Sequence, residues 1–171
     1  MPSRCVDMRE SLPTTYRSRS KSDIANIVVH HSGEAPLDMS PEAAARATAR
    51  YHIEDNGWPG CGYHVIIVRD GSWAYCNSLT VISYHAGGVN NVRGVGVCLW
   101  GDYRIGPVPA AMVDSLEEIC RWIMQEKRAW AEDTGAAYVA PTIVGHRDVS
   151  ATTCPGDYGA AATEEVRRRL A

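Results

Sequence analysis

The stretch Ile143-Val-Gly-His-Arg-Asp-Val-Ser-Ala-Thr-Thr-Cys-Pro-Gly156 joins a short apolar run to a loop that glycine and proline bracket. It places His146 and Cys154 eight positions apart. Imidazole and thiolate are both good zinc ligands, but a catalytic zinc site needs three protein ligands and leaves its fourth position to water or substrate. The third ligand must therefore come from another part of the chain.

A second apolar run, Ile27-Val-Val-His-His-Ser-Gly33, supplies the candidate. Its β-branched residues predict a buried strand that ends at a histidine. Side chains alternate across a strand, so His30 and His31 cannot both face one site, and spacing does not choose between them. We take His30, His146 and Cys154 as the ligands of one open-sited Zn²⁺. The alternatives are a buried core histidine and a buried thiol.

The predicted elements alternate irregularly between strands and helices. Short apolar runs predict strands at 24–30, 63–68, 73–76, 95–100 and 143–146, with an Asp-Gly hairpin turn between the second and the third. Helices are predicted at 41–55, 109–133 and 160–170, whereas 81–91 is expected to be irregular. Gly94 and Gly96 indicate that another group approaches the backbone closely there. The pattern favours one α/β domain with a mixed sheet flanked by helices.

Composition is that of an ordinary globular domain. The chain has 171 residues, of which 45% are apolar and 22% charged, and its net charge of −3 does not suggest a nucleic-acid-binding surface. The first residues lack the apolar stretch of a signal peptide, and no run approaches the roughly 20 apolar residues of a membrane span. The six cysteines contain no CxxC pair, so we expect most of them to be small buried side chains.

The polar segment 1–23 is expected to be an N-terminal leader that precedes a catalytic domain at 24–171. Its stretch 18–22 combines serines with basic residues and is predicted to be loosely held. Val6, Met8 and Leu12 are apolar and can pack on the domain. The leader is therefore expected to pack on the domain in part.

Four more side chains are candidates for chemistry. Tyr63 and His64 open a predicted strand directly after a glycine-rich turn, and a tyrosine there can orient a nucleophile or donate to an oxyanion. His85 lies in a glycine-rich loop and is a substrate contact or a surface histidine. Thr152 can contact the substrate carbonyl or stabilise its loop. His52, on a predicted helix, is interpreted as an exposed or half-buried residue and not as a ligand.

Four blocks of the sequence, taken in order, resemble the zinc-dependent N-acetylmuramoyl-L-alanine amidases of the type-2 amidase and peptidoglycan recognition protein superfamily, among them phage endolysins of the T7 lysozyme kind. The blocks are Ile27-Val-Val-His-His-Ser-Gly33; Gly62-Tyr-His-Val-Ile-Ile-Val-Arg-Asp-Gly71; Tyr84-His-Ala-Gly87 with Gly94-Val-Gly-Val-Cys-Leu-Trp-Gly101; and Gly145-His-Arg-Asp-Val-Ser-Ala-Thr-Thr-Cys-Pro-Gly156. The resemblance implies that family's amidase fold. It also implies zinc ligands at His30, the first histidine of its block, at His146 and at Cys154.

The same resemblance implies catalytic roles for Tyr63, His85 and Thr152, and a substrate contact for His85. His64, which opens the same predicted strand as Tyr63, is predicted to be a second substrate contact. T7-type lysozymes carry a lysine at the position of Thr152, whereas peptidoglycan recognition amidases typically carry threonine there. We therefore expect that this chain does not use a lysine to stabilise the transition state.

The implied reaction is hydrolysis of the amide between N-acetylmuramic acid and L-alanine by zinc-activated water, with bacterial peptidoglycan as the partner. We expect a monomer that binds no nucleic acid and inserts into no membrane. Alternatives are a non-catalytic peptidoglycan-binding module and a cytoplasmic muropeptide-recycling amidase. Non-enzymatic relatives typically lose the cysteine ligand, which favours catalysis here. The absence of an export signal suits a phage endolysin, made in the host cytoplasm and released to the wall by a separate membrane protein.

Overall fold

A six-stranded sheet with the order β1-β4-β3-β5-β2-β6 forms the centre of the computed structural model, which describes residues 4–35 and 37–171. Its strands are β1 (Cys5–Asp7), β2 (Asn26–His31), β3 (Val65–Ile67), β4 (Trp73–Tyr75), β5 (Gly94–Leu99) and β6 (Thr142–Gly145). β3 and β4 form the antiparallel hairpin that the Asp-Gly turn predicts, whereas β5 pairs in parallel with β3 and β2, and β6 in parallel with β2. This mixed sheet confirms the predicted α/β class.

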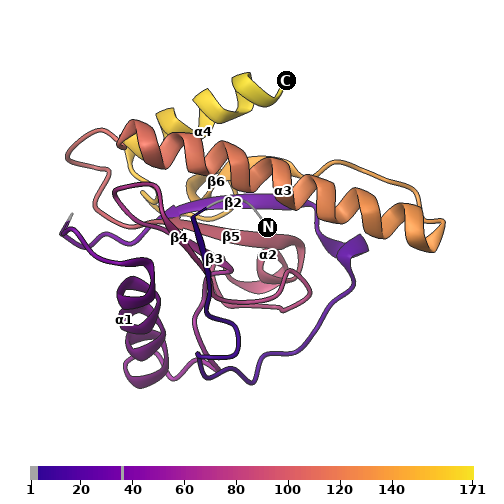
Figure 1. Ribbon diagram of the computed structural model, residues 1–171, viewed down its shortest axis with the longest axis horizontal. Coiled ribbons are helices and arrows are strands. Elements are labelled where there is room, and N and C mark those ends of the chain that lie inside the picture. Colours follow the sequence, from indigo (N-terminus) through magenta and orange to yellow (C-terminus); the bar gives the residue numbers. More distant parts are fainter. Residues whose placement is uncertain (1–3, 36) are drawn as a thin grey trace.

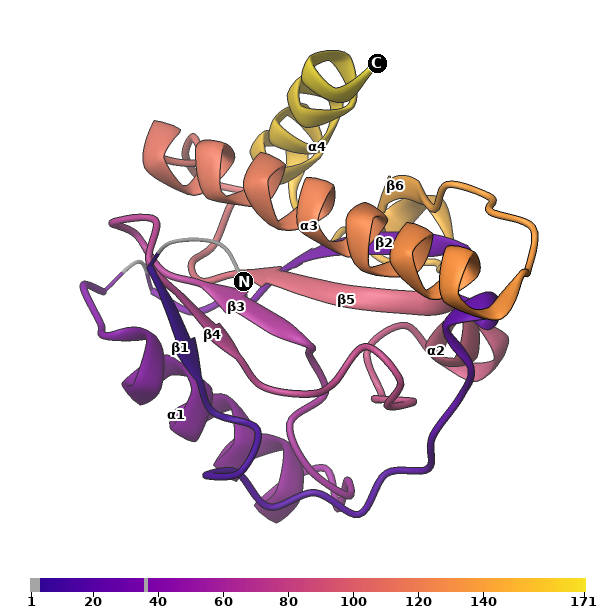
Figure 2. The same cartoon turned by 45° about the vertical axis from the view of Figure 1, so that its right-hand side comes forward.

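Helices cover both faces of the sheet (Figure 1). They are α1 (Pro41–Glu54), α2 (Gly88–Arg93), α3 (Ala110–Thr134) and α4 (Asp157–Leu170), with short 3₁₀ turns η1 (Lys21–Asp23) and η2 (His146–Asp148). α3 and α4 lie on one face and α1 on the other, as the turned view in Figure 2 also shows. Within the described residues, none of these helices combines the length and apolar character that crossing a membrane requires.

The predicted helix boundaries follow local chemistry. The Ser40 hydroxyl accepts a hydrogen bond from the backbone N–H of Ala43 at 3.2 Å, and Pro41 occupies the first helical position of α1. Gly135, at a φ of 69°, ends α3 in the left-handed conformation. The final helix α4 begins at Asp157, three residues before the predicted start at 160.

Two apolar cores lie on opposite faces of the sheet, and the alternation of strand side chains assigns residues to them. Ile27 and Val29 of β2 belong to the core beneath α3 and α4, as do Val95 and Val97 of β5. Cys98, of opposite parity on β5, belongs to the core on the α1 side. By the same alternation, the α1 side is the face to which the even-numbered positions of β2 point.

Two predictions about irregular segments are wrong. Segment 81–91 contains the start of α2, because the Asn91 side-chain oxygen accepts from three backbone N–H groups, those of His85, Ala86 and Gly87, at 2.8 to 2.9 Å. Segment 18–22 is not loosely held, because Arg19 is buried, with 7% of its surface exposed. Met8 and Leu12 pack in the core on the α1 side.

Candidate metal centre

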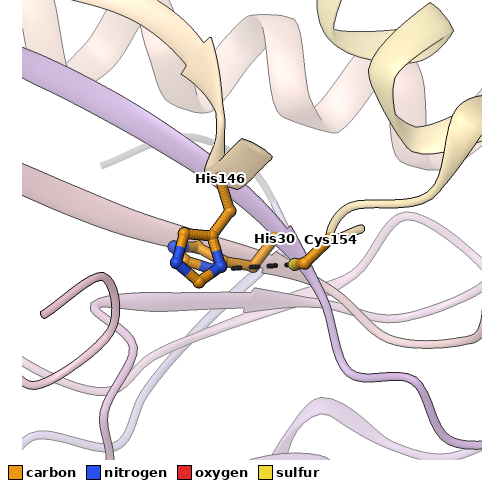
Figure 3. A group of neighbouring side chains, drawn as sticks. All are labelled: His30, His146 and Cys154. Atoms are coloured by element: carbon orange, nitrogen blue, oxygen red, sulfur yellow. Dashed lines mark hydrogen bonds between the residues drawn. The ribbon is translucent and has the colours of Figure 1, made fainter. Parts of the chain in front are cut away.

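Three side chains from distant segments converge at the carboxyl ends of β2 and β6 (Figure 3). The parallel register pairs Val29 with Gly145, so His30 and His146 follow directly on neighbouring strands. The loop that returns from η2 to α4 carries Cys154 to the same point. One ligand atom from each of His30, His146 and Cys154 lies within 4.8 Å of the others.

The donor set and its spacing fit zinc. Cys154 Sγ lies 3.8 Å from His30 Nδ1. Tetrahedral zinc with a Zn–S bond of about 2.3 Å and a Zn–N bond of about 2.0 Å separates sulfur from nitrogen by about 3.5 Å. Two imidazoles and one thiolate leave one tetrahedral position for water or substrate, the arrangement of a catalytic site and not of a closed structural site.

His31 lies on the other side of the strand and takes no part in this group. Its Nδ1 accepts a hydrogen bond from the backbone N–H of Tyr103 at 3.1 Å, and the Asp102 carboxylate lies 3.6 Å from the same nitrogen. The backbone N–H of His31 nevertheless points to the site and donates to Cys154 Sγ at 3.4 Å. Strand periodicity leaves open which of the two histidines faces the site, and the structure places the His30 side chain, not that of His31, beside His146 and Cys154.

The imidazoles at the centre are neutral at pH 7. Burial lowers the pKa of His30 well below its usual value, and the neighbouring His85 and His146 lower it further. Burial also lowers the pKa of His146, and it lowers the pKa of His85 to about 3. A neutral imidazole keeps the lone pair that a metal requires.

Tyr63 borders the centre on the side of α1. Its ring centroid lies 5.2 Å from that of His30. Burial, with Cys98 next in effect, raises the pKa of the Tyr63 phenol well above its usual value, so the hydroxyl keeps its proton at neutral pH. The residue lines a hollow of about 390 Å³ whose other walls include Glu34, Arg50 and Tyr51.

His85 also borders the centre, with its ring centroid 5.2 Å from that of His30. It lines a second hollow of about 380 Å³ together with His146, Trp58 and Tyr84. His85 Nδ1 lies 3.0 Å from His30 Nε2, and His85 Nε2 lies 3.2 Å from the carbonyl oxygen of Gly94. The surface histidine considered above is excluded, because His85 is only 7% exposed.

His64 does not reach either hollow, contrary to the prediction of a substrate contact. The side chain is fully buried. Its Nδ1 accepts from the backbone N–H of Gly96 at 3.0 Å, and its Nε2 lies 3.0 Å from the carbonyl oxygen of Val81, to which it donates. Both nitrogens therefore serve internal hydrogen bonds that join β5 to the loop before α2.

His52 is also buried, so the prediction of an exposed or half-buried residue is wrong. Its Nδ1 accepts from the backbone N–H of Gly62 at 2.9 Å and so holds the turn that precedes Tyr63. Thr152 is exposed, and its hydroxyl accepts from the backbone N–H of Cys154 at 3.2 Å. This contact agrees with the loop-stabilising alternative for Thr152, and a catalytic contact stays a prediction.

Arg19 is the residue near this centre that sequence reasoning missed. Its guanidinium donates to the carbonyl oxygens of Leu79, Asn91, Val92 and Gly94 at 2.6 to 3.1 Å. No pattern in the serine-rich segment signals this burial. The glycines at 94 and 96 signal the approach of His85 instead, because a Cβ at Gly96 would lie 2.7 Å from His85 Cγ.

Comparison with known proteins agrees with this geometry. The family model described as N-acetylmuramoyl-L-alanine amidase matches residues 20–157. The chain belongs to this family. Similar proteins include the endolysin of Klebsiella phage KP32, 29% identical over 136 residues that cover 79% of this chain and 82% of that protein. Peptidoglycan recognition protein 1 of Bos indicus is 24% identical over 151 residues, 86% of this chain and 74% of that protein.

Solved structures of family relatives share the fold. The N-acetylmuramoyl-L-alanine amidase LysC from Clostridium intestinale superposes with a TM-score of 0.73 at 24% identity, covering 99% of this chain and 98% of that one. Drosophila PGRP-LB superposes with a TM-score of 0.76 at 26% identity, covering 92% and 90%. A variant of PGRP-LB, solved in complex with tracheal cytotoxin, has a TM-score of 0.77 at 25% identity, with coverage of 92% and 91%.

Proposed function

We propose that this protein is a zinc-dependent peptidoglycan hydrolase that cleaves the amide bond between N-acetylmuramic acid and L-alanine. The observation that supports this most directly is the convergence of His30, His146 and Cys154, with one ligand atom of each within 4.8 Å of the others. Membership of the amidase family supplies the reaction class. The complex of a PGRP-LB variant with tracheal cytotoxin supports a peptidoglycan fragment as the substrate.

The ligand set gives the chemistry of the centre. When bound by these three residues, a zinc ion would act as a Lewis acid that polarises the scissile carbonyl and activates the attacking water. His30 and His146 would contribute neutral nitrogens. Burial raises the pKa of the Cys154 thiol to about 11, so Cys154 would contribute the negative charge of a thiolate once the metal displaces its proton. The sulfur is held in place by the backbone N–H of His31.

Tyr63 is the proposed hydrogen-bond donor to the developing oxyanion. Its hydroxyl keeps its proton because burial raises its pKa, and its ring packs 5.2 Å from that of His30. A phenol fixed at this edge can donate a hydrogen bond where negative charge grows in the transition state while keeping its own proton. Thr152, beside Cys154, is proposed as a second polar contact to the substrate.

The two hollows are the proposed binding sites for the substrate. One lies beside Tyr63 and carries charged side chains, and the other lies beside His146 and carries the aromatic residues Trp58 and Tyr84. A substrate with a peptide on one side of the cleaved bond and a sugar on the other requires such a pair of sites flanking the reacting group. His85, in the wall of the second hollow, is proposed to contact the bound substrate there.

A phage endolysin is the proposed biological setting. The support is the 29% identity to the endolysin of Klebsiella phage KP32, over most of both chains. We propose that the protein acts on the cell wall as a monomer. The competing function is a peptidoglycan-binding module without catalysis, a possibility that the peptidoglycan recognition relatives raise. The presence of all three candidate ligands favours the enzyme.

Mass analysis of digested peptidoglycan tests the proposal. Purified sacculi are incubated with the zinc-loaded protein, and the soluble products are identified. The expected products are glycan chains free of peptide and stem peptides with a new L-alanine amino terminus. Chelation should abolish their release and added zinc should restore it. Binding to sacculi without new amino termini would reject the enzyme in favour of the binding module, and full activity after verified zinc removal would reject the metal mechanism.

A further inference from the structure

A chain of hydrogen bonds runs from the interior of the protein to the candidate metal centre. The carbonyl oxygen of Gly94 lies 3.2 Å from His85 Nε2, His85 Nδ1 lies 3.0 Å from His30 Nε2, and His30 Nδ1 faces Cys154 Sγ at 3.8 Å. All three histidine contacts are buried or partly buried. Two imidazoles therefore stand in series between a backbone carbonyl and the metal ligands.

The carbonyl at the start of this chain determines where every proton lies. A carbonyl oxygen only accepts, so the proton of the neutral His85 ring is on Nε2. His85 Nδ1 then carries a lone pair and accepts from His30 Nε2–H. The neutral His30 ring has no second proton, so its Nδ1 presents a lone pair toward Cys154. This is the tautomer that can bind a metal through Nδ1 without rearrangement.

We propose that His85 is a positioning residue that holds His30 in the metal-binding tautomer and orientation. This role differs from the substrate contact discussed above, because it acts through His30 and exists before substrate or metal arrives. The inference rests on the proposed zinc site. Hydrogen-bond partners of metal-bound histidines fix ring orientation, and their loss typically weakens metal affinity by about 10- to 100-fold.

The surroundings of His85 hold it rigidly enough for this role. The Arg19 guanidinium donates to the same Gly94 oxygen at 2.7 Å and so restrains the acceptor on which His85 depends. The backbone of Gly94 and Gly96 packs directly against the His85 ring. A Cβ at either position would lie 2.7 Å from a carbon of that ring. The backbone N–H of His85 is fixed by the Asn91 side chain at 2.9 Å.

The first experiment reads the tautomer in the absence of metal. Long-range ¹H–¹⁵N spectra of the metal-free protein, with His30 assigned by the loss of its signals in His30→Gln, identify which ring nitrogen carries the proton. The expected result is a proton on Nε2 and none on Nδ1. A population with the proton mainly on Nδ1 would overturn the proposal.

The second experiment compares zinc affinity by competition with a chromophoric chelator. His85→Leu removes the acceptor and should raise the zinc dissociation constant by about 10- to 100-fold. His85→Asn places its side-chain oxygen near the former position of Nδ1, so it should recover most of the affinity. Recovery by asparagine separates a hydrogen-bond role from general packing, because the smaller asparagine fills the space no better than leucine does.

The outcomes separate this inference from the proposed function. Parent-like zinc affinity in a folded His85→Leu protein would overturn the positioning role and leave the amidase proposal standing. Failure of the parent protein to release stem peptides, together with tight zinc binding that depends on His85, would overturn the proposed reaction and support the positioning role. Circular dichroism of each metal-free variant establishes that it is folded before affinities are compared.

Discussion

The backbone N–H of His31 donates a hydrogen bond to Cys154 Sγ at 3.4 Å, and thus joins two residues that lie 123 positions apart. The contact places the sulfur beside the end of β2 independently of any metal. The donor is His31, the residue next to the proposed ligand His30. The side chain of His30 lies on the same side of the strand as the sulfur. The double-histidine sequence therefore supplies one side-chain ligand and one backbone donor to the same centre.

Replacing the sulfur should remove metal binding. In Cys154→Ser, the hydroxyl stays protonated at neutral pH and is a far poorer zinc ligand than a thiolate. We expect less than stoichiometric zinc after dialysis, measured by mass spectrometry of the metal content, together with loss of amidase activity. The matched control is Cys120→Ser, which alters a buried thiol in α3 away from the centre and should keep one zinc per chain. Stoichiometric, tight zinc in Cys154→Ser would contradict the proposed ligand set.

Zinc should stabilise the folded protein, because the three ligands come together only in the native state. At a free zinc concentration 100 times the dissociation constant, the expected gain in unfolding free energy is about 2.7 kcal/mol. For a chain of this size, a gain of that order should raise the melting temperature by about 5 to 10 °C. Calorimetry with and without zinc measures this shift. Magnesium, and zinc added to Cys154→Ser, should leave the melting temperature unchanged.

Much of this architecture could be predicted from local sequence, and the remainder depends on contacts between distant segments. The strands that end at His30 and His146 are visible as short β-branched runs, but their adjacency depends on the pairing of β2 with β6. Spacing alone could not separate His30 from His31, because the answer depends on which face of the sheet each helix covers. The resemblance to known amidases favoured His30, in agreement with the geometry.

The missed features share one cause: a polar side chain whose partners are backbone groups elsewhere in the chain. Arg19 looks like part of a solvated basic segment, and its burial follows from carbonyl oxygens that the loop around α2 supplies. α2 follows a turn in which the Asn91 side-chain oxygen accepts hydrogen bonds from three backbone N–H groups. His64 was predicted to contact substrate, but its ring is held in the interior by the backbone N–H of Gly96 and the carbonyl oxygen of Val81. Neither hydrophobic periodicity nor motif spacing carries this information.

Removing the Arg19 guanidinium should be strongly destabilising. The pKa of this side chain is lowered by burial to about 10, so it remains charged at neutral pH and donates to four carbonyl oxygens. Arg19→Met would remove the guanidinium donor from four carbonyl oxygens, of which that of Gly94 would still face His85 Nε2, at a cost of at least about 3 kcal/mol in unfolding free energy. The exposed Arg17 provides the control, because Arg17→Met should change stability by less than about 0.5 kcal/mol. Urea denaturation measures both, and equal effects would refute the anchoring role of Arg19.

A methyl group at Gly96, next to the His85 ring, should disturb the candidate metal centre without contacting a proposed ligand. In Gly96→Ala, the new Cβ would meet His85 Cγ at 2.7 Å, so the ring must move. Overpacking of this kind typically costs about 1–3 kcal/mol. We also expect weaker zinc binding, because the contact from His85 to His30 lengthens. Gly106→Ala is the control, since nothing lies within 4 Å of its Cβ position. Unchanged stability and zinc affinity in Gly96→Ala would show that the ring is not confined there.

Tyr63→Phe should separate chemistry from metal binding. The substitution keeps the ring that packs against His30 and removes only the hydroxyl, whose raised pKa keeps it protonated. Loss of one donor to an oxyanion typically lowers kcat by about 10²- to 10³-fold. Zinc content and KM should stay close to those of the parent protein. Tyr158→Phe is the control, because Tyr158 is exposed on α4 and lines neither hollow, so the activity of this variant should match that of the parent. Activity of Tyr63→Phe within a few-fold of the parent would mean that another group donates to the oxyanion, and Thr152 would then be the next residue to replace.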